Sequence, residues 1–212
     1  GAGVPTRCLI TDMNQVLGRS VGNAVEMAEC IEFLLNPAQA DERLVDLTLD
    51  LAAHMLELSG VADNLDDARD KASAALNQGR AAQVFARMVA GLGGPKDLLE
   101  KPKHYLPQAP IIKPILALHS GYVSAMDARA IGLSLVSLKA GRSKADDAID
   151  YAVGFTNMVQ IGDYIEQGQA LAVAHVRNDN QLTSVNTELV NLIHLSPDAP
   201  VLKALVKEIY QA

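Results

Sequence analysis

Apolar residues recur at helical spacing through most of the first hundred positions. In the run 24–35 they lie three and four residues apart, and Asn36-Pro37 ends the run. Asn23 fits the N-cap of this helix, because Glu26 follows three residues later, close to a capping-box pattern. Three further helices are expected over about 41–59, 66–79 and 80–90, and a short one is expected to begin at Pro95.

One short apolar run precedes these helices and predicts a buried strand. It covers residues 7–12 and is bounded by Pro5 and Asn14. Because one strand cannot form a sheet, its partners must lie elsewhere. The opening segment Gly1–Pro5 has no initiator Met. Together these features predict that the chain is a cleaved, trimmed or truncated part of a longer protein.

The pattern changes after a proline-rich stretch that predicts an extended connector. Beyond it, short apolar runs predict strands at 115–124, 153–155, 158–161, 164–165 and 170–176. Helices are expected at 127–138 and 181–195, and a short helix or turn at 146–151. Residues 201–210 have helical spacing but would also suit an edge strand. The chain is therefore expected to be α/β, with helices dominating the first half and strands the second.

Turn glycines flank the expected strand at 164–165. Gly162 and Gly168 lie where small β-sandwich hybrid modules, such as biotinyl and lipoyl carriers, turn their corners. A carrier would need a lysine at the hairpin tip, and the run 162–171 contains none. This segment is therefore interpreted as a structural hairpin.

Composition excludes several classes of function. The net charge of −7 over 212 residues argues against binding to a nucleic-acid backbone. The sequence contains no apolar run of the ~18 residues that a membrane helix needs. Cys8 and Cys30 form no C-x-x-C pair and are interpreted as buried thiols in a reducing compartment. We expect a cytoplasmic protein with neither membrane nor nucleic acid among its partners.

The loop between the first strand and the first helix is the strongest candidate for a binding site. Gly18 and Gly22 bracket it, and backbone amides at a helix N-terminus can bind an anion. The spacing matches neither a Walker loop nor a dinucleotide fingerprint. Three readings stay open: a loop that only caps a helix, an anion site, or a monovalent cation held by loop carbonyls and a carboxylate such as Glu29.

Other polar residues give weaker signals. Asp12 follows the first strand, where open α/β sheets place ligand sites, but it would also anchor its own loop. The five histidines show no metal-ligand spacing, and no Gly-x-Ser-x-Gly elbow is present. The basic turn Arg142-Ser143-Lys144 would face an anionic ligand, another domain or only solvent.

Several motifs resemble the pyrimidine nucleoside phosphorylase family. The first is Thr11-Asp12-Met13-Asn14-Gln15-Val16-Leu17-Gly18 with Val21-Gly22-Asn23-Ala24-Val25-Glu26. Three more follow in the family's order: Gly121–Asp127 with Ala130-Ile131-Gly132, then Ile149–Phe155, then Ile161-Gly162-Asp163. Val16 stands where many broad-specificity members have Pro, which resembles the thymidine phosphorylase branch. The resemblance covers nearly the whole chain and weakens after about Asn180.

The resemblance implies a fold and its division. It implies the later part of the family's large α/β domain over 1–105, a Pro-rich connector over 106–114 and a β-rich barrel-sandwich hybrid domain of α+β type over 115–212. This is the C-terminal portion of the family's enzymes, which are cytoplasmic homodimers. Their dimer contacts lie mainly in a helical domain that nothing here matches.

The resemblance also implies an activity. The family's enzymes are pentosyltransferases of nucleoside salvage that convert thymidine and phosphate to thymine and 2-deoxyribose 1-phosphate. Their phosphate loop and base-binding residues precede the segment seen here, so we assign no catalytic or substrate-binding residue and expect this chain alone to be inactive. No cofactor is required. Some members hold a structural K⁺, which the alignment would place at the carbonyls of Leu17 and Ser20 and the carboxylate of Glu29.

Two alternatives remain open at this point. A related phosphoribosyltransferase shares the large-domain architecture, but it would need a diphosphate-binding loop, and the hybrid C-terminal region argues against it. A non-catalytic module that binds a ligand or partner is the other alternative.

Overall fold

The computed structural model describes residues 3–211, so the first two residues of the segment 1–5 lie outside it. These residues form two compact units, each discontinuous in sequence. Unit 1 consists of the described residues of Gly1–Asp12, Cys30–Glu100 and Lys203–Ala212. Unit 2 consists of Met13–Glu29 and Lys101–Leu202. Whether the domain limits at 105 and 115 hold stays a prediction.

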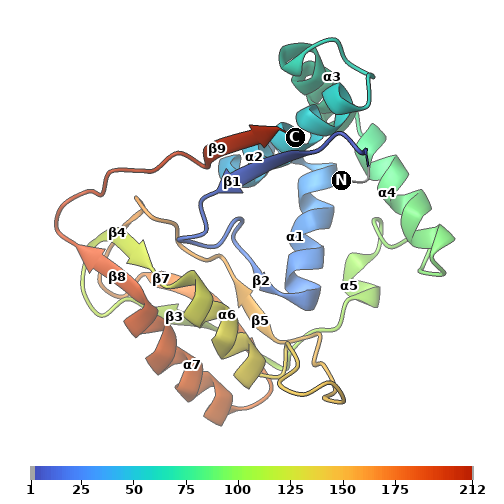
Figure 1. Ribbon diagram of the computed structural model, residues 1–212. Helices are drawn as coiled ribbons and strands as arrows, with labels where there is room; N and C mark the ends of the chain where they lie inside the picture. Colours follow the sequence, from blue (N-terminus) through green and yellow to red (C-terminus); the bar gives the residue numbers. More distant parts are fainter. Residues whose placement is uncertain (1–2, 212) are drawn as a thin grey trace. The chain divides into compact units, whose positions relative to one another are not determined.

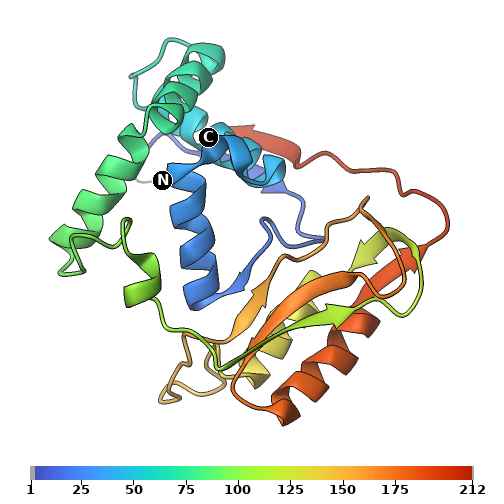
Figure 2. The same cartoon turned by 180° about the vertical axis from the view of Figure 1, so that it is seen from behind.

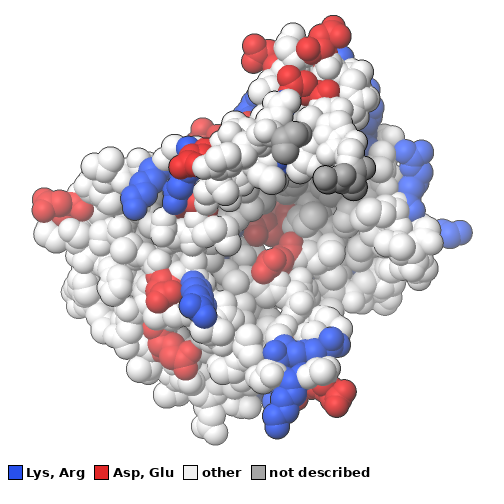
Figure 3. All heavy atoms as spheres, in the orientation of Figure 1, with Lys and Arg blue, Asp and Glu red and all other residues white. Residues whose placement is uncertain are grey.

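Unit 1 combines a bundle of helices with a two-stranded antiparallel sheet (Figure 1). The helices are α2 (Glu42–Leu58), α3 (Leu65–Asn77), α4 (Arg80–Gly91), the short η1 (Pro37–Gln39) and the second part of α1 (Asn23–Leu35). Phe33, Leu49 and Leu76 form one core cluster, and small alanines at 53, 62 and 68 form another. In Figure 3, acidic side chains gather over the end of unit 1 that carries α3.

The helices of unit 1 begin and end where their caps predict. Asp41 caps α2 by accepting from the amides of Arg43 and Leu44, and Gly60 follows its end with φ +71°. Two details of the prediction are wrong. Asn23 is already helical, and its side chain donates to the carbonyl of Ala140. The expected helix at Pro95 is a turn region, and the short α5 (Pro102–Tyr105) follows it.

The first strand finds its partner at the other end of the chain. Strand β1 (Arg7–Thr11) pairs antiparallel with β9 (Val206–Gln211), with Cys8 opposite Tyr210. This pairing decides between the two readings of the tail in favour of the strand, since inter-strand hydrogen bonds outweigh the helical spacing of a short exposed segment. It also corrects two burial predictions. Alternate residues of β1 are exposed, and Cys8, with its thiol free, lies on the exposed face.

Unit 2 is built on two antiparallel sheets (Figure 1). The larger has the order β2-β5-β7-β3, from β2 (Val21–Gly22), β5 (Gly154–Thr156), β7 (Ala170–Val176) and β3 (Ile111–Leu116). The smaller has the order β6-β4-β8, from β6 (Tyr164–Ile165), β4 (Gly121–Met126) and β8 (Ile193–Ser196). Helix α7 (Asp179–Leu192) packs on β3 and β7, while α6 (Ala128–Ser137) packs on α7, and Figure 2 shows the opposite face of that sheet toward the viewer.

A single large core holds unit 2 together. Its fully buried side chains come from both sheets and both helices and include Ile115, Phe155, Leu171 and Leu189. Val16 and Val21 pack against this core from the early segment Met13–Glu29. The expected α/β class, with a β-rich α+β C-terminal part, is therefore confirmed.

The strand boundaries of unit 2 differ from the expectation in four places. The run 115–124 is two strands with a turn between them, β3 begins inside the expected connector, and 158–161 is not a strand. The helix expected over 181–195 ends at Leu192, and the residues after it form β8. In each case a short apolar run is compatible with either state, and pairing in the sheet decides between them.

Candidate functional site

The candidate loop lies against the carboxylate of Glu29 in the first helix. Glu29 Oε1 accepts from the amide of Arg19 at 2.6 Å, and Oε2 accepts from the amide of Ser20 at 3.1 Å. Gly18 is buried here, and a Cβ at this position would lie 2.7 Å from Glu29 Oε1. A side chain at this position would force the Glu29 carboxylate to shift, so glycine allows the close approach of the backbone to that carboxylate. The loop therefore wraps the Glu29 carboxylate with its amides.

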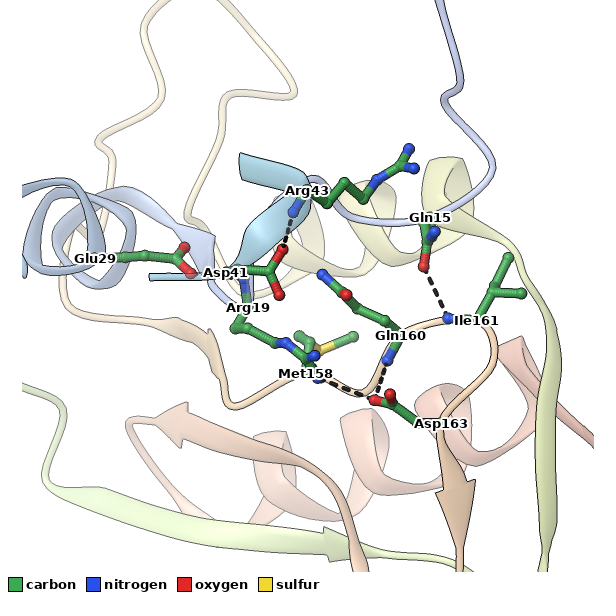
Figure 4. Close-up of polar contacts among 9 residues, drawn as sticks. All are labelled: Gln15, Arg19, Glu29, Asp41, Arg43, Met158, Gln160, Ile161 and Asp163. Carbon is green, nitrogen blue, oxygen red and sulfur yellow. Dashed lines mark hydrogen bonds and ion pairs between the residues drawn. The ribbon is translucent and has the colours of Figure 1, made fainter. Parts of the chain in front are cut away.

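The other side of the same loop is bound by the turn at 158–163 (Figure 4). The guanidinium of Arg19 donates to Asp163 Oδ2 at 3.0 Å and to the carbonyl of Met158 at 3.2 Å. In return the amide of Met158 donates to the carbonyl of Arg19 at 2.9 Å. Asp163 also accepts from the amide of Gln160 at 2.8 Å, so its carboxylate closes the turn and holds the loop together.

A second contact joins the two segments near the start of the loop. The amide of Ile161 donates to Gln15 Oε1 at 2.8 Å (Figure 4). After the loop, Val21 and Gly22 pair with Phe155 and Gly154. Segment 15–22 is thus joined along its length to residues that follow it by more than 130 positions.

The residues expected to hold K⁺ come from this loop and the helix beside it. Leu17 is exposed, Ser20 is half-buried, and Ser20 contacts Glu29 through its amide. A carboxylate has about four acceptor positions, so the two amide bonds leave Glu29 with capacity for a cation. Residues 3–211 contain no group of three or more His, Cys, Asp or Glu side chains placed to share a metal ion. A hard monovalent cation needs only oxygen ligands, and the loop and Glu29 fit that requirement.

Asp12 acts as an anchor within unit 1. Its side chain is about 5% exposed, accepts from Arg43 Nη2 at 3.2 Å and lies 3.1 Å from Lys207 Nζ. Its amide donates to the carbonyl of Leu205. The rule that ligands bind at the carboxyl ends of parallel strands does not apply here, since β1 pairs antiparallel with β9. The contacts favour the structural reading of this residue.

The remaining candidates also make structural contacts. His54 is buried, and its Nδ1 lies 2.7 Å from Arg7 Nη1, which also pairs with Glu57. In the basic turn, Asp147 accepts from the amides of Ser143 and Lys144 at 3.0 and 2.9 Å. That turn is exposed and closed by its own hydrogen bonds.

Sequence reasoning missed the part that Gln15, Arg19 and Asp163 play in this loop. Gln15 and Asp163 stood inside the motifs that carry the family resemblance, but nothing in their spacing shows that they meet. Arg19 and Asp163 are separated by 144 positions. Local sequence patterns carry no information about contacts between residues this far apart, so only the tertiary structure could reveal this one.

Residues 122–196 match the family model of the pyrimidine nucleoside phosphorylase C-terminal domain. The match begins within β4, ends with the last residue of β8 and lies entirely in unit 2. It covers less than half of the chain and supports the resemblance seen in the motifs. This part of the chain is therefore similar to the C-terminal domain of pyrimidine nucleoside phosphorylases. No helix within residues 3–211 is both long and apolar enough to cross a membrane.

Proposed function

We propose that this chain is part of a thymidine phosphorylase. The observation that carries the proposal is the match of residues 122–196 to the C-terminal domain of the family, with the family's loop motif at Thr11–Gly18 ahead of it. Val16 in that motif favours the thymidine branch. In the reaction, a phosphate oxygen bonds to the anomeric carbon of the deoxyribose as the bond to the base nitrogen breaks. The products are thymine and 2-deoxyribose 1-phosphate.

The chain's own share in this reaction is structural. Negative charge develops on the leaving base and must be met by placed donors, and phosphate needs an anion cradle. The family's residues for both tasks have no counterpart among the motifs of this chain. We therefore expect the 212-residue chain to be inactive alone. From the family resemblance, we expect the complete enzyme to be a cytoplasmic homodimer.

The assay measures thymine released from thymidine and phosphate, for the purified 212-residue chain and for the product of the complete gene that contains it. We expect release by the complete product only, faster with thymidine than with uridine. Release by the isolated chain would disprove its inactivity. A complete product that prefers uridine would remove the thymidine assignment and leave the family intact.

We also propose that the loop 17–20 and Glu29 hold a K⁺ ion. The carbonyls of Leu17 and Ser20 would share the ion with the Glu29 carboxylate, and the ion would balance charge and hold the loop. Glu29 is close enough for this role, since its carboxylate already contacts the amides of Arg19 and Ser20.

The ion is tested by thermal unfolding in KCl against NaCl at equal ionic strength. An ion that binds only the folded state raises its stability by RT ln(1 + [L]/Kd), so the transition should rise with K⁺ concentration. Glu29→Gln should abolish this dependence. The control is Glu32→Gln in the same helix, whose carboxylate contacts Asn36 and not the loop. An equal response of all three proteins to K⁺ would contradict the site.

A further inference from the structure

The loop before the first helix is held on two opposite sides by different parts of unit 2. On one side the Glu29 carboxylate accepts from the amides of Arg19 and Ser20. On the other side the turn 158–163 binds the side chains of Gln15 and Arg19. The two sets of contacts meet at Arg19, whose amide faces Glu29 while its guanidinium faces Asp163. A change at Asp163 is therefore transmitted to the amides around Glu29 through one residue.

The negative charge of Asp163 is not needed by the turn in which this residue lies. It directly precedes the short strand β6, its carbonyl accepts from the amide of Val123, and its carboxylate accepts from the amide of Gln160. An Asn side chain would keep an oxygen acceptor for that amide. What Asn cannot supply is a charged partner for Arg19 at 3.0 Å. The carboxylate charge thus acts mainly on the loop.

The partial exposure of the pair limits the size of this effect. Arg19 and Asp163 are 40% and 36% exposed in their side chains, so the ion pair alone should shift a local equilibrium by about two- to fivefold. The backbone bond from Met158 and the Gln15 contact remain when the charge is removed. The loop should therefore become more mobile without detaching.

We propose that Asp163 is a positioning residue for the loop 17–20: through Arg19 it holds the loop amides and carbonyls in register with Glu29, and so sets how tightly the loop holds a monovalent cation. The part that concerns the cation rests on the proposed K⁺ site. The part that concerns the loop stands on the contacts alone.

The test compares Asp163→Asn and Arg19→Gln with the unaltered chain by amide hydrogen exchange and by the K⁺ dependence of thermal unfolding. We expect the Arg19 and Ser20 amides to exchange about two- to fivefold faster in both variants. The apparent Kd for K⁺, obtained from the K⁺ dependence of thermal unfolding, should rise by a similar factor. Both changes remove the same ion pair, and Arg19→Gln also removes the bond to the Met158 carbonyl, so the double variant should show no further effect beyond that of Arg19→Gln. Arg19→Gln keeps the Asp163 carboxylate that closes the turn, so it stays informative if Asp163→Asn folds poorly.

The matched control is Asp150→Asn, which removes another ion pair of unit 2. The Asp150 carboxylate pairs with Arg177 at 2.6 Å and accepts from the amide of Ala152, and neither partner belongs to the loop 17–20. The Asp150→Asn variant should have a lower transition temperature. The hydrogen-exchange rates of the Arg19 and Ser20 amides and the apparent Kd for K⁺ should not change. If Asp163→Asn and Arg19→Gln behave like this control, the positioning role is overturned. If the unaltered chain shows no specific response to K⁺, the cation part is overturned, while hydrogen exchange still decides whether Asp163 positions the loop.

Discussion

At the scale of single residues, burial decides how much each ion pair contributes. Asp12 and Arg43 are about 5% and 12% exposed in their side chains, whereas Arg69 and its partner Asp46 are 38% and 49% exposed. A buried charge that loses its partner keeps its desolvation cost, while an exposed one is rehydrated. The pairs of unit 1 should therefore differ widely in their effect on stability.

Replacing Asp12 with Asn should destabilise the protein by about 3 kcal/mol, because it leaves Arg43 buried without its counter-charge. Urea denaturation measures the change in the free energy of unfolding. The matched control, Asp46→Asn, should cost less than about 1 kcal/mol. Equal losses in the two variants would show that burial does not set the contribution of Asp12.

The Asp150–Arg177 pair predicts a pH dependence. The hydrogen bond from the Arg177 guanidinium holds the pKa of the Asp150 carboxyl below its ordinary value, with help from the Ala152 amide and against a smaller effect of burial. A carboxyl with a lowered pKa in the folded state stabilises the protein above its ordinary pKa of about 3.9 and loses this contribution as the pH falls through the lowered value.

The stability difference between the unaltered chain and Asp150→Asn should therefore be constant near neutrality and vanish in acid. Since the Arg177 side chain is 44% exposed, the difference should stay below about 1 kcal/mol. Denaturant titrations from pH 7 to the acid limit measure it. The control Asp198→Asn, at an exposed position, should show no such convergence. A difference that grows as the pH falls would contradict the assignment.

At the scale of elements, the helices followed from local signals more reliably than the strands. The caps of α2 and α6 lie at Asp41 and Asp127, where the predicted helices begin. Strands β2, β8 and β9 were missed or left open because they are two to six residues long and owe their structure to their partner strands.

Glycine positions show where two strands lie too close together for a side chain. A Cβ at Gly154 would lie 2.6 Å from the carbonyl oxygen of Val21 in the neighbouring strand.

Gly154→Ala should destabilise unit 2 by about 1–3 kcal/mol, because β2 and β5 cannot separate without losing their pairing. Gly132→Ala is the matched change in α6, where an added Cβ meets no atom within 4 Å. It should stabilise by about 0.5–1 kcal/mol through the lower entropy of the unfolded chain. Thermal unfolding of both variants checks the opposite signs, and the same sign in both would contradict this account.

At the scale of the whole molecule, segments from the two ends of the chain complete units that lie elsewhere in the sequence. Lys203–Ala212 belongs with the helices of unit 1, and Met13–Glu29 belongs with the sheets of unit 2. Helix α1 is divided between the two units at Glu29 and Cys30. Each unit nevertheless has its own core, so a change in one should first affect its own members.

Truncation after Lys203 tests this independence. It removes β9, the Lys207 contact with Asp12 and the Gln211 contact with Arg7. Hydrogen exchange should show lost protection in β1, which keeps no strand partner among the described residues, and unchanged protection in β7. Equal loss in β7 would show that the units unfold together.

The sequence by itself determined the α/β class, most helices of the first half and the family resemblance, and it singled out the loop 17–22 as a candidate site. These features rest on hydrophobic periodicity, caps and short motifs, which act within a few residues of the chain. Only the tertiary structure decided which strands pair, that Cys8 is exposed, and that Asp163 meets Arg19 across 144 positions. Such contacts depend on closing long loops and on burial in a shared core, and neither is encoded by the spacing of neighbouring residues.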